Sequence, residues 1–175
     1  MTEHAIVRAT LHHTAVALDD NADAPARARQ HQRYHQDEGF ADLAYHFMVD
    51  REGNVYEGRS TAFAGETFTE YDPSGHLLIT AEGDLDQQDL PPAQLDAIVA
   101  LLAWGMDEFD LDPAEIGGHS DFASTSCPGD SLRPLIDDGR ITEMVEDRLA
   151  QSRTRLVLVC GDDAAARVAA IEAGE

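Results

Sequence analysis

Short apolar runs of strand length alternate along this chain with stretches that have the periodicity of amphipathic helices. The clearest helical stretch covers residues 93–109 and follows two prolines. Its apolar residues recur at spacings of three, four and seven and so share one helix face: Leu95, Ile98, Val99, Leu102, Met106 and Phe109. The runs at 6–11, 43–49 and 77–80 are too short for helices and predict strands. This alternation predicts a layered α/β domain.

The remaining segments predict a hairpin, two more helices and a long loop. Residues 26–36 are rich in helix formers, and Pro25 suits the first turn of that helix. A turn at 51–54 joins the second predicted strand to a short strand after it, which predicts a β-hairpin. Residues 141–149 have the pattern of another amphipathic helix. Residues 60–75 show no period and are expected to form a surface loop.

The C-terminal tail has a character of its own. The run 156–160 predicts a strand, and the Ala-rich sequence after it predicts a helix. We expect a domain at 1–150 and a strand–helix extension at 151–175. The predicted strand could add to the sheet edge, pair with another chain or begin a further module. Cys160 lies in the apolar run and is expected to be a small buried residue.

The charge of the chain limits its partners. Twelve Arg, no Lys and 34 Asp and Glu give a formal net charge of −22. Nucleic acids and anionic lipids are bound by basic surfaces, so neither is expected as a partner. Disorder is not expected, because 43% of the residues are hydrophobic and lie in periodic runs that can form a core. A GC-rich genome and a salt-adapted host both explain the composition.

The sequence also bears on where the protein acts. Two cysteines are too few for a disulfide framework. No basic region followed by an apolar stretch stands at the N-terminus, so no signal peptide is expected. No apolar run approaches the ~20 residues that span a bilayer, so no membrane insertion is expected. A cytoplasmic protein and a phage-encoded protein released to the cell wall both fit, and the oligomeric state stays open.

Some of the eight histidines have the spacing of metal ligands. Zinc binds imidazole nitrogen and thiolate sulfur in a tetrahedron, and a catalytic site keeps its fourth position for water. His119 and Cys127 lie in one loop, eight residues apart, so both side chains could reach one point. His12 or His13, at the end of a predicted strand, could supply the third ligand. Taken singly, a histidine in a loop is usually a surface residue and a lone cysteine is usually a small buried one.

Several motifs in order carry a resemblance to a known family. They are His12-His13-Thr14-Ala15, Asp42-Leu43-Ala44-Tyr45-His46-Phe47, Gly53-Asn54-Val55-Tyr56-Glu57-Gly58-Arg59, Gly118-His119 and Thr125-Ser126-Cys127-Pro128-Gly129. Over residues 5–150 the chain resembles the zinc-dependent N-acetylmuramoyl-L-alanine amidases. That family includes phage lysozyme-type amidases and peptidoglycan recognition proteins.

The resemblance implies a fold and a metal site. The implied fold is a central mixed β-sheet flanked by helices, with a Zn²⁺ ion held in a groove by His12, His119 and Cys127. Adjacent strand residues face opposite sides, so His13 is expected to hydrogen bond beside the site or simply to pack. Tyr45 corresponds to the family's catalytic tyrosine and is expected to face away from His46.

Two further residues acquire possible roles from the resemblance. The hydroxyl of Thr125, two residues before Cys127, is expected to help stabilise a developing oxyanion. Arg59 could contact substrate or form a structural ion pair.

The implied reaction is zinc-dependent hydrolysis of the amide between N-acetylmuramic acid and L-alanine in peptidoglycan. The loop from Thr61 to Gly75 departs from the family pattern that lines the substrate groove. A muropeptide-binding recognition module and a zinc amide hydrolase with another substrate therefore remain alternatives. Non-catalytic family members typically lose the cysteine ligand, so the presence of Cys127 favours an enzyme. A purely structural zinc fits less well, because three protein ligands leave an open position.

Overall fold

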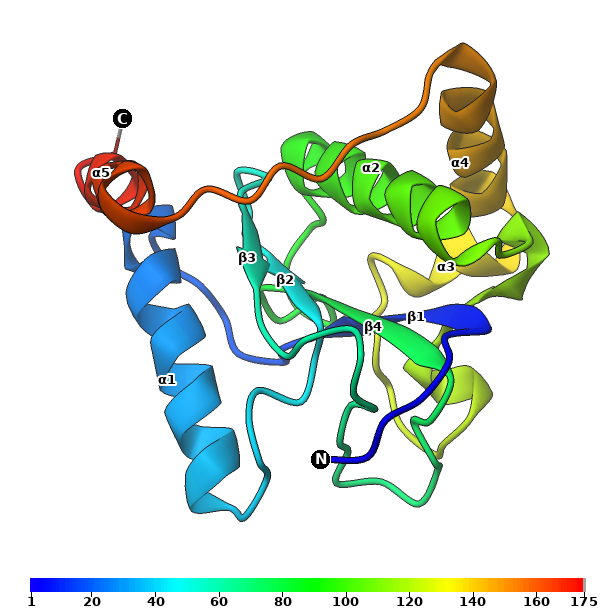
Figure 1. Ribbon diagram of the computed structural model, residues 1–175, viewed down its shortest axis with the longest axis horizontal. Coiled ribbons are helices and arrows are strands. Elements are labelled where there is room, and N and C mark those ends of the chain that lie inside the picture. Colours follow the sequence, from blue (N-terminus) through cyan, green and yellow to red (C-terminus); the bar gives the residue numbers. More distant parts are fainter. Residues whose placement is uncertain (175) are drawn as a thin grey trace.

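Five strands form one mixed sheet, described by a computed structural model that covers residues 1–174 (Figure 1). The strands are β1 (Arg8–His13), β2 (Phe47–Val49), β3 (Val55–Glu57), β4 (His76–Ala81) and β5 (Ile116–Gly118). Their order across the sheet is β3-β2-β4-β1-β5. β1 runs parallel to β4 and β5, β4 runs parallel to β2, and only the hairpin β2–β3 is antiparallel. The expected central mixed sheet with flanking helices is confirmed.

The two faces of the sheet have different chemistry. On one face Ala9 and Leu11 of β1 join Leu77 and Ile79 of β4 in the hydrophobic core. The residues between them in sequence point to the other face, because side chains alternate along a strand. That second face is buried but polar; the hydroxyl of Thr10 lies 2.8 Å from Nδ1 of His76 there. The sheet therefore separates an apolar core from a polar layer.

Helix α2 (Pro92–Phe109) covers the apolar face, as its periodicity predicted. Ile98 and Leu102 are buried in the core, and α4 (Arg140–Gln151) packs beside α2 (Figure 1). Gly105 allows the close approach of α2 to β4, since a Cβ there would come within 2.5 Å of Leu77 Cδ2. The predicted helix at 141–149 is confirmed in α4. The short helix α3 (Arg133–Asp137) was not expected from the sequence.

The hairpin β2–β3 turns around one buried carboxylate. Asp50 accepts hydrogen bonds from the backbone amides of Glu52 and Asn54 and from the hydroxyl of Tyr56, at 2.9 to 3.0 Å. The predicted hairpin is confirmed. The predicted strand at 43–49 is too long, because only Phe47–Val49 pairs in the sheet.

Helix α1 (Ala24–Asp37) stands at the end of the sheet where the parallel strands finish (Figure 1). Its predicted range is confirmed, with Pro25 in the first turn. Glu82, fully buried just after β4, holds the helix in place. Arg27 lies 3.3 Å and His31 3.1 Å from the carboxylate oxygens of Glu82.

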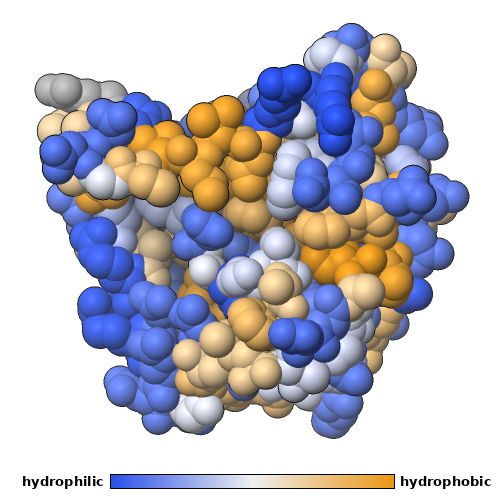
Figure 2. Space-filling model, viewed as in Figure 1, coloured by the Kyte–Doolittle hydropathy of each residue, from blue (hydrophilic) through white to orange (hydrophobic). Residues whose placement is uncertain are grey.

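The tail is helical at its end but has no strand. Residues 152–160 run extended across the molecule to α5 (Gly161–Glu172), which lies beside α1 (Figure 1). The predicted strand at 156–160 is wrong: the segment lines a groove with β3 but makes no ladder with it. Figure 2 shows a hydrophobic strip along this part of the surface. Its exposed apolar residues are Val157, Leu158 and Val159.

Two other expectations concern the tail and membranes. Cys160 is exposed and not buried, as are Val157, Leu158 and Val159 just before it. The division of the chain at residue 150 stays a prediction.

Among residues 1–174, none of the helices combines the length and the apolar character needed to cross a bilayer.

Candidate metal centre

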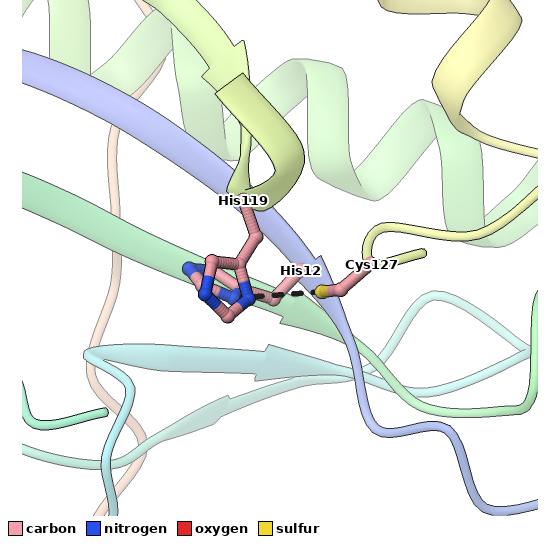
Figure 3. Close-up of side chains that lie close together, drawn as sticks. All are labelled: His12, His119 and Cys127. Atoms are coloured by element: carbon pink, nitrogen blue, oxygen red, sulfur yellow. Dashed lines mark hydrogen bonds between the residues drawn. The ribbon is translucent and has the colours of Figure 1, made fainter. Parts of the chain in front are cut away.

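Three side chains from distant parts of the chain meet on the polar face of the sheet. His12 lies near the end of β1, His119 directly follows β5, and Cys127 lies eight residues further on. One ligand atom from each lies within 4.8 Å of the other two. Sγ of Cys127 is 3.6 Å from Nδ1 of His12, and the two imidazole rings are 4.6 Å apart between centroids (Figure 3). The parallel pairing of β1 with β5 places the two histidines together.

The backbone brings Cys127 back to the strand ends. The amide of Ser120 donates to the carbonyl of Cys127 at 2.9 Å, and the amide of His13 donates to its Sγ at 3.4 Å. Gly118 leaves room for the segment that carries Cys127 to pack against the end of β5, since a Cβ at Gly118 would lie 2.8 Å from Cδ of Pro128. The sulfur therefore has a fixed position, set by the chain on both sides of it.

The donor set and its surroundings fit a zinc ion. Two imidazoles and one thiol are ligands that zinc prefers, and three protein ligands leave one position open. All three side chains are buried. Burial lowers the pKa of His12 and of His119, which keeps their nitrogen lone pairs free. Burial also raises the pKa of the Cys127 thiol to about 12, so a cation is needed to hold it as a thiolate.

Tyr45 lies beside this cluster and faces into the same cavity. Its ring centroid is 5.1 Å from that of His12. Burial, together with the nearby Cys127, raises the pKa of its phenol, so the hydroxyl stays protonated at neutral pH. His46 points the other way and hydrogen bonds to the carbonyl of Phe63 at 3.0 Å. The two side chains thus diverge as expected, although neither residue belongs to a strand of the sheet.

Thr125 lines the cavity as well. Its Oγ1 accepts a hydrogen bond from the amide of Cys127 at 3.2 Å. The hydroxyl proton is not used by that contact and can be donated to a ligand. The cavity has a volume of about 250 Å³ and includes Phe40 and Phe68 in its wall.

The side chains of His13 and Arg59 both form contacts within the protein that support its fold. The His13 side chain accepts a hydrogen bond from the amide of Leu85 at 3.1 Å through Nδ1 and is not one of the three side chains of the cluster with Cys127. Arg59 is buried; it donates to the carbonyls of Leu43 and Ala64 and forms an ion pair with Glu66. Of the two roles considered for Arg59, the structure supports the ion pair.

Three residues at the site escaped the sequence analysis. Thr69 Oγ1 lies 2.8 Å from Nε2 of His119, and the Tyr71 hydroxyl lies 3.5 Å from Nε2 of His12. Both belong to the loop that was considered only as a substrate wall. His35 of α1 lines the cavity four residues after His31, and this helical spacing is the one signal that could have placed both on the inner face of α1.

Comparisons with known proteins agree with this geometry. Residues 2–130 match the family described as N-acetylmuramoyl-L-alanine amidase. Peptidoglycan recognition protein 1 of Mus musculus is 34% identical over 139 residues, which are 76% of this chain and 75% of the mouse protein. Peptidoglycan-recognition protein SC2 of Drosophila melanogaster is 33% identical over 127 residues, 71% of this chain and 68% of the fly protein.

Solved structures show the same fold. Human PGRP-IBETAC, in complex with glycosamyl muramyl pentapeptide, superposes with a TM-score of 0.69 at 27% identity, covering 78% of this chain and 85% of the human one. The N-acetylmuramoyl-L-alanine amidase LysC from Clostridium intestinale gives a TM-score of 0.67 at 20% identity, with the same coverage of 78% and 85%. Fold, matched range and relatives agree: the chain belongs to the N-acetylmuramoyl-L-alanine amidase family.

Proposed function

We propose that this protein is a zinc-dependent amidase that cleaves the bond between the lactyl group of N-acetylmuramic acid and L-alanine of a peptidoglycan stem peptide. The observation that carries the proposal is the convergence of His12, His119 and Cys127 within 4.8 Å, in a cavity that also holds Tyr45. A zinc ion held by these three ligands supplies Lewis acidity and an activated water nucleophile at neutral pH. The reaction breaks the C–N bond, adds the water oxygen to the lactyl carbonyl carbon and leaves a proton on the departing amine.

Tyr45 and Thr125 are the hydrogen-bond donors for the carbonyl oxygen. Negative charge develops on that oxygen when the carbonyl carbon becomes tetrahedral, and donors already in place stabilise it most. The raised pKa of Tyr45 keeps its proton available for this bond. Thr125 is a neutral donor, oriented by its contact with the amide of Cys127.

The proposed substrate class rests on the relatives and on the cavity wall. The similar proteins are peptidoglycan recognition proteins, and one similar structure holds a muramyl pentapeptide. In this chain Phe40 and Phe68 stack with ring centroids 4.5 Å apart, and Phe68 is 59% exposed at the cavity. Exposed Phe68, backed by half-buried Phe40, offers apolar area for a ligand face next to the candidate metal centre.

Digestion of peptidoglycan tests the proposal. Purified protein is incubated with sacculi, and the soluble products are identified by mass spectrometry with and without a chelator. The expected products are free stem peptides that begin at L-alanine, and their release should stop on chelation.

Two results would favour the alternatives. Retention of the protein on sacculi without release of peptides would indicate a recognition module. Binding of one zinc ion without cleavage or retention would favour an amide hydrolase with another substrate.

A further inference from the structure

The loop before β4 contacts both histidines of the candidate metal centre. Thr69 Oγ1 is 2.8 Å from Nε2 of His119, and the Tyr71 hydroxyl is 3.5 Å from Nε2 of His12. The ring of Tyr71 also packs against His119, with 5.1 Å between centroids. Both hydroxyl contacts fall on Nε2, and in His12 the other nitrogen, Nδ1, is the one that faces Sγ of Cys127.

Thr69, which contacts His119, also contacts a second hydroxyl group, that of Thr67. Oγ1 of Thr67 lies 2.7 Å from Oγ1 of Thr69 and also accepts the backbone amide of Thr69 at 3.1 Å. A local turn explains the bond to the amide. It does not require the two hydroxyls and the imidazole of His119 to lie in one hydrogen-bonded row.

The direction of the protons along this row decides which nitrogen of His119 is free. If the Thr69 hydroxyl donates to Thr67, its oxygen must accept the proton on Nε2 of His119. Nδ1 then carries the lone pair and can bind a metal. If the row ran the other way, the proton would sit on Nδ1 and would have to leave before a metal could bind.

We propose that Thr69, backed by Thr67, is a positioning residue that holds His119 as the tautomer with its proton on Nε2 and thereby tightens metal binding. This inference rests on the proposed metal centre and deepens it. Residues behind metal ligands set ring orientation and tautomer, and their loss typically weakens metal affinity or activity roughly 10- to 100-fold.

The same loop is also anchored by contacts that do not involve His12 or His119. Glu66, directly before Thr67, pairs with the buried Arg59 and accepts the amide of Ala41 at 3.0 Å. Further on, the amide of Gly75 donates to Nδ1 of His4 at 2.8 Å. A loop held at both ends can set the position of the Thr69 hydroxyl more firmly than a free loop could. Removal of that hydroxyl should therefore leave the loop in place.

The affinity for metal tests the inference without any turnover. Co²⁺ and Zn²⁺ are titrated into metal-free protein, and the Co²⁺ complex is followed by its visible absorption. We expect Thr69→Val to weaken both metals roughly 10- to 100-fold. Thr69→Ser should restore the affinity, and Thr67→Val should give a smaller loss. Thr61→Val, in the same loop but outside the row, is the matched control and should bind like the wild type.

The outcomes separate this inference from the proposed function. If the wild-type chain binds neither metal, the metal centre itself is wrong. If the wild type binds metal and Thr69→Val binds it equally well, the role of Thr69 is wrong. Failure of Thr69→Ser to restore binding would also contradict it, because the serine keeps the hydroxyl. Thermal unfolding of each metal-free variant shows whether a loss of affinity comes from misfolding.

Discussion

Sγ of Cys127 lies 3.6 Å from Nδ1 of His12, although 115 positions separate the two residues in the sequence. The two atoms face one another in a buried site where the thiol has a pKa of about 12. A divalent cation between them would bind the nitrogen and hold the sulfur as a thiolate.

Loss of the sulfur should therefore remove the metal. Cys127→Ser is expected to lose bound zinc, measured as metal content after dialysis, and to lose amidase activity with it. Cys160→Ser is the matched control, because Cys160 is exposed on the tail. Zinc retained in full by Cys127→Ser, or lost equally from Cys160→Ser, would contradict the assignment of the ligands.

Tyr45→Phe should separate catalysis from metal binding. The phenylalanine keeps the ring beside His12 and removes only the hydroxyl. Loss of one such donor typically lowers kcat by roughly 10²- to 10³-fold. Steady-state kinetics should show that decrease in kcat while the zinc content stays at the wild-type level. A variant that loses zinc would show that Tyr45 supports the metal, and an unchanged kcat would remove its catalytic role.

His46 should make the protein sensitive to acid. Its Nδ1 accepts a hydrogen bond from the amide of Leu78 at 2.9 Å, and its Nε2 lies 3.0 Å from the carbonyl of Phe63. Both nitrogens of the neutral ring therefore have a hydrogen-bond partner. Burial lowers its pKa from 6.5 to about 4. The unfolded chain therefore binds more protons between these values, and the free energy of unfolding falls as pH drops from 6.5 towards 4. The loss from this residue should be on the order of 3 kcal/mol.

Urea unfolding at a series of pH values measures this dependence. His46→Gln cannot titrate and should be less stable at pH 7 but lose less stability between pH 6.5 and 4. The other histidines titrate in both proteins, so the difference in slope belongs to His46. Parallel slopes in the wild type and the variant would contradict the expected role.

Salt should stabilise the chain. With a net charge of −22 its acidic groups repel one another, and the Debye length falls from ~8 Å at 0.15 M to ~3 Å at 1 M ionic strength. The thermal midpoint should rise with NaCl concentration. Asp107 and Glu108 are exposed in the last turn of α2, where negative charge also opposes the helix dipole. The double variant Asp107→Asn/Glu108→Gln should show a smaller rise of the thermal midpoint with salt.

A wild-type thermal midpoint that stays level or falls with salt would contradict salt adaptation and leave codon bias as the explanation of the composition.

Elements with a strong local period were predictable. The apolar residues of α2 recur with the helical period, and the face that they form is the one that meets the sheet and buries Ile98 and Leu102. The run from 156 to 160 has an equally strong preference for strand, but a strand also needs a partner to hydrogen bond. β3, beside it, is only three residues long and pairs with β2 alone. Local preference carries no information about that missing partner.

Some residues of the candidate site could likewise be predicted from the sequence, and others could not. Residue type and spacing left His12 and His13 as alternatives beside His119 and Cys127. The resemblance of the ordered motifs to the amidase family selected His12, and the structure brings His12, His119 and Cys127 together. Their membership of a zinc site stays a prediction. Thr69 and Tyr71 could not be selected, since hydroxyl groups in an irregular loop are common and only the folded backbone brings them to the two imidazoles.

The most direct test of the account is the rate of cleavage of a defined N-acetylmuramoyl peptide as zinc is returned to metal-free protein. Products are identified by mass spectrometry, so the bond that breaks is observed along with the rate. The account predicts no cleavage without zinc, a rate that rises linearly and saturates at one zinc ion per chain, and a released peptide that begins at L-alanine. Cleavage at full rate without metal, or saturation with one zinc ion and no cleavage at this amide, would contradict it.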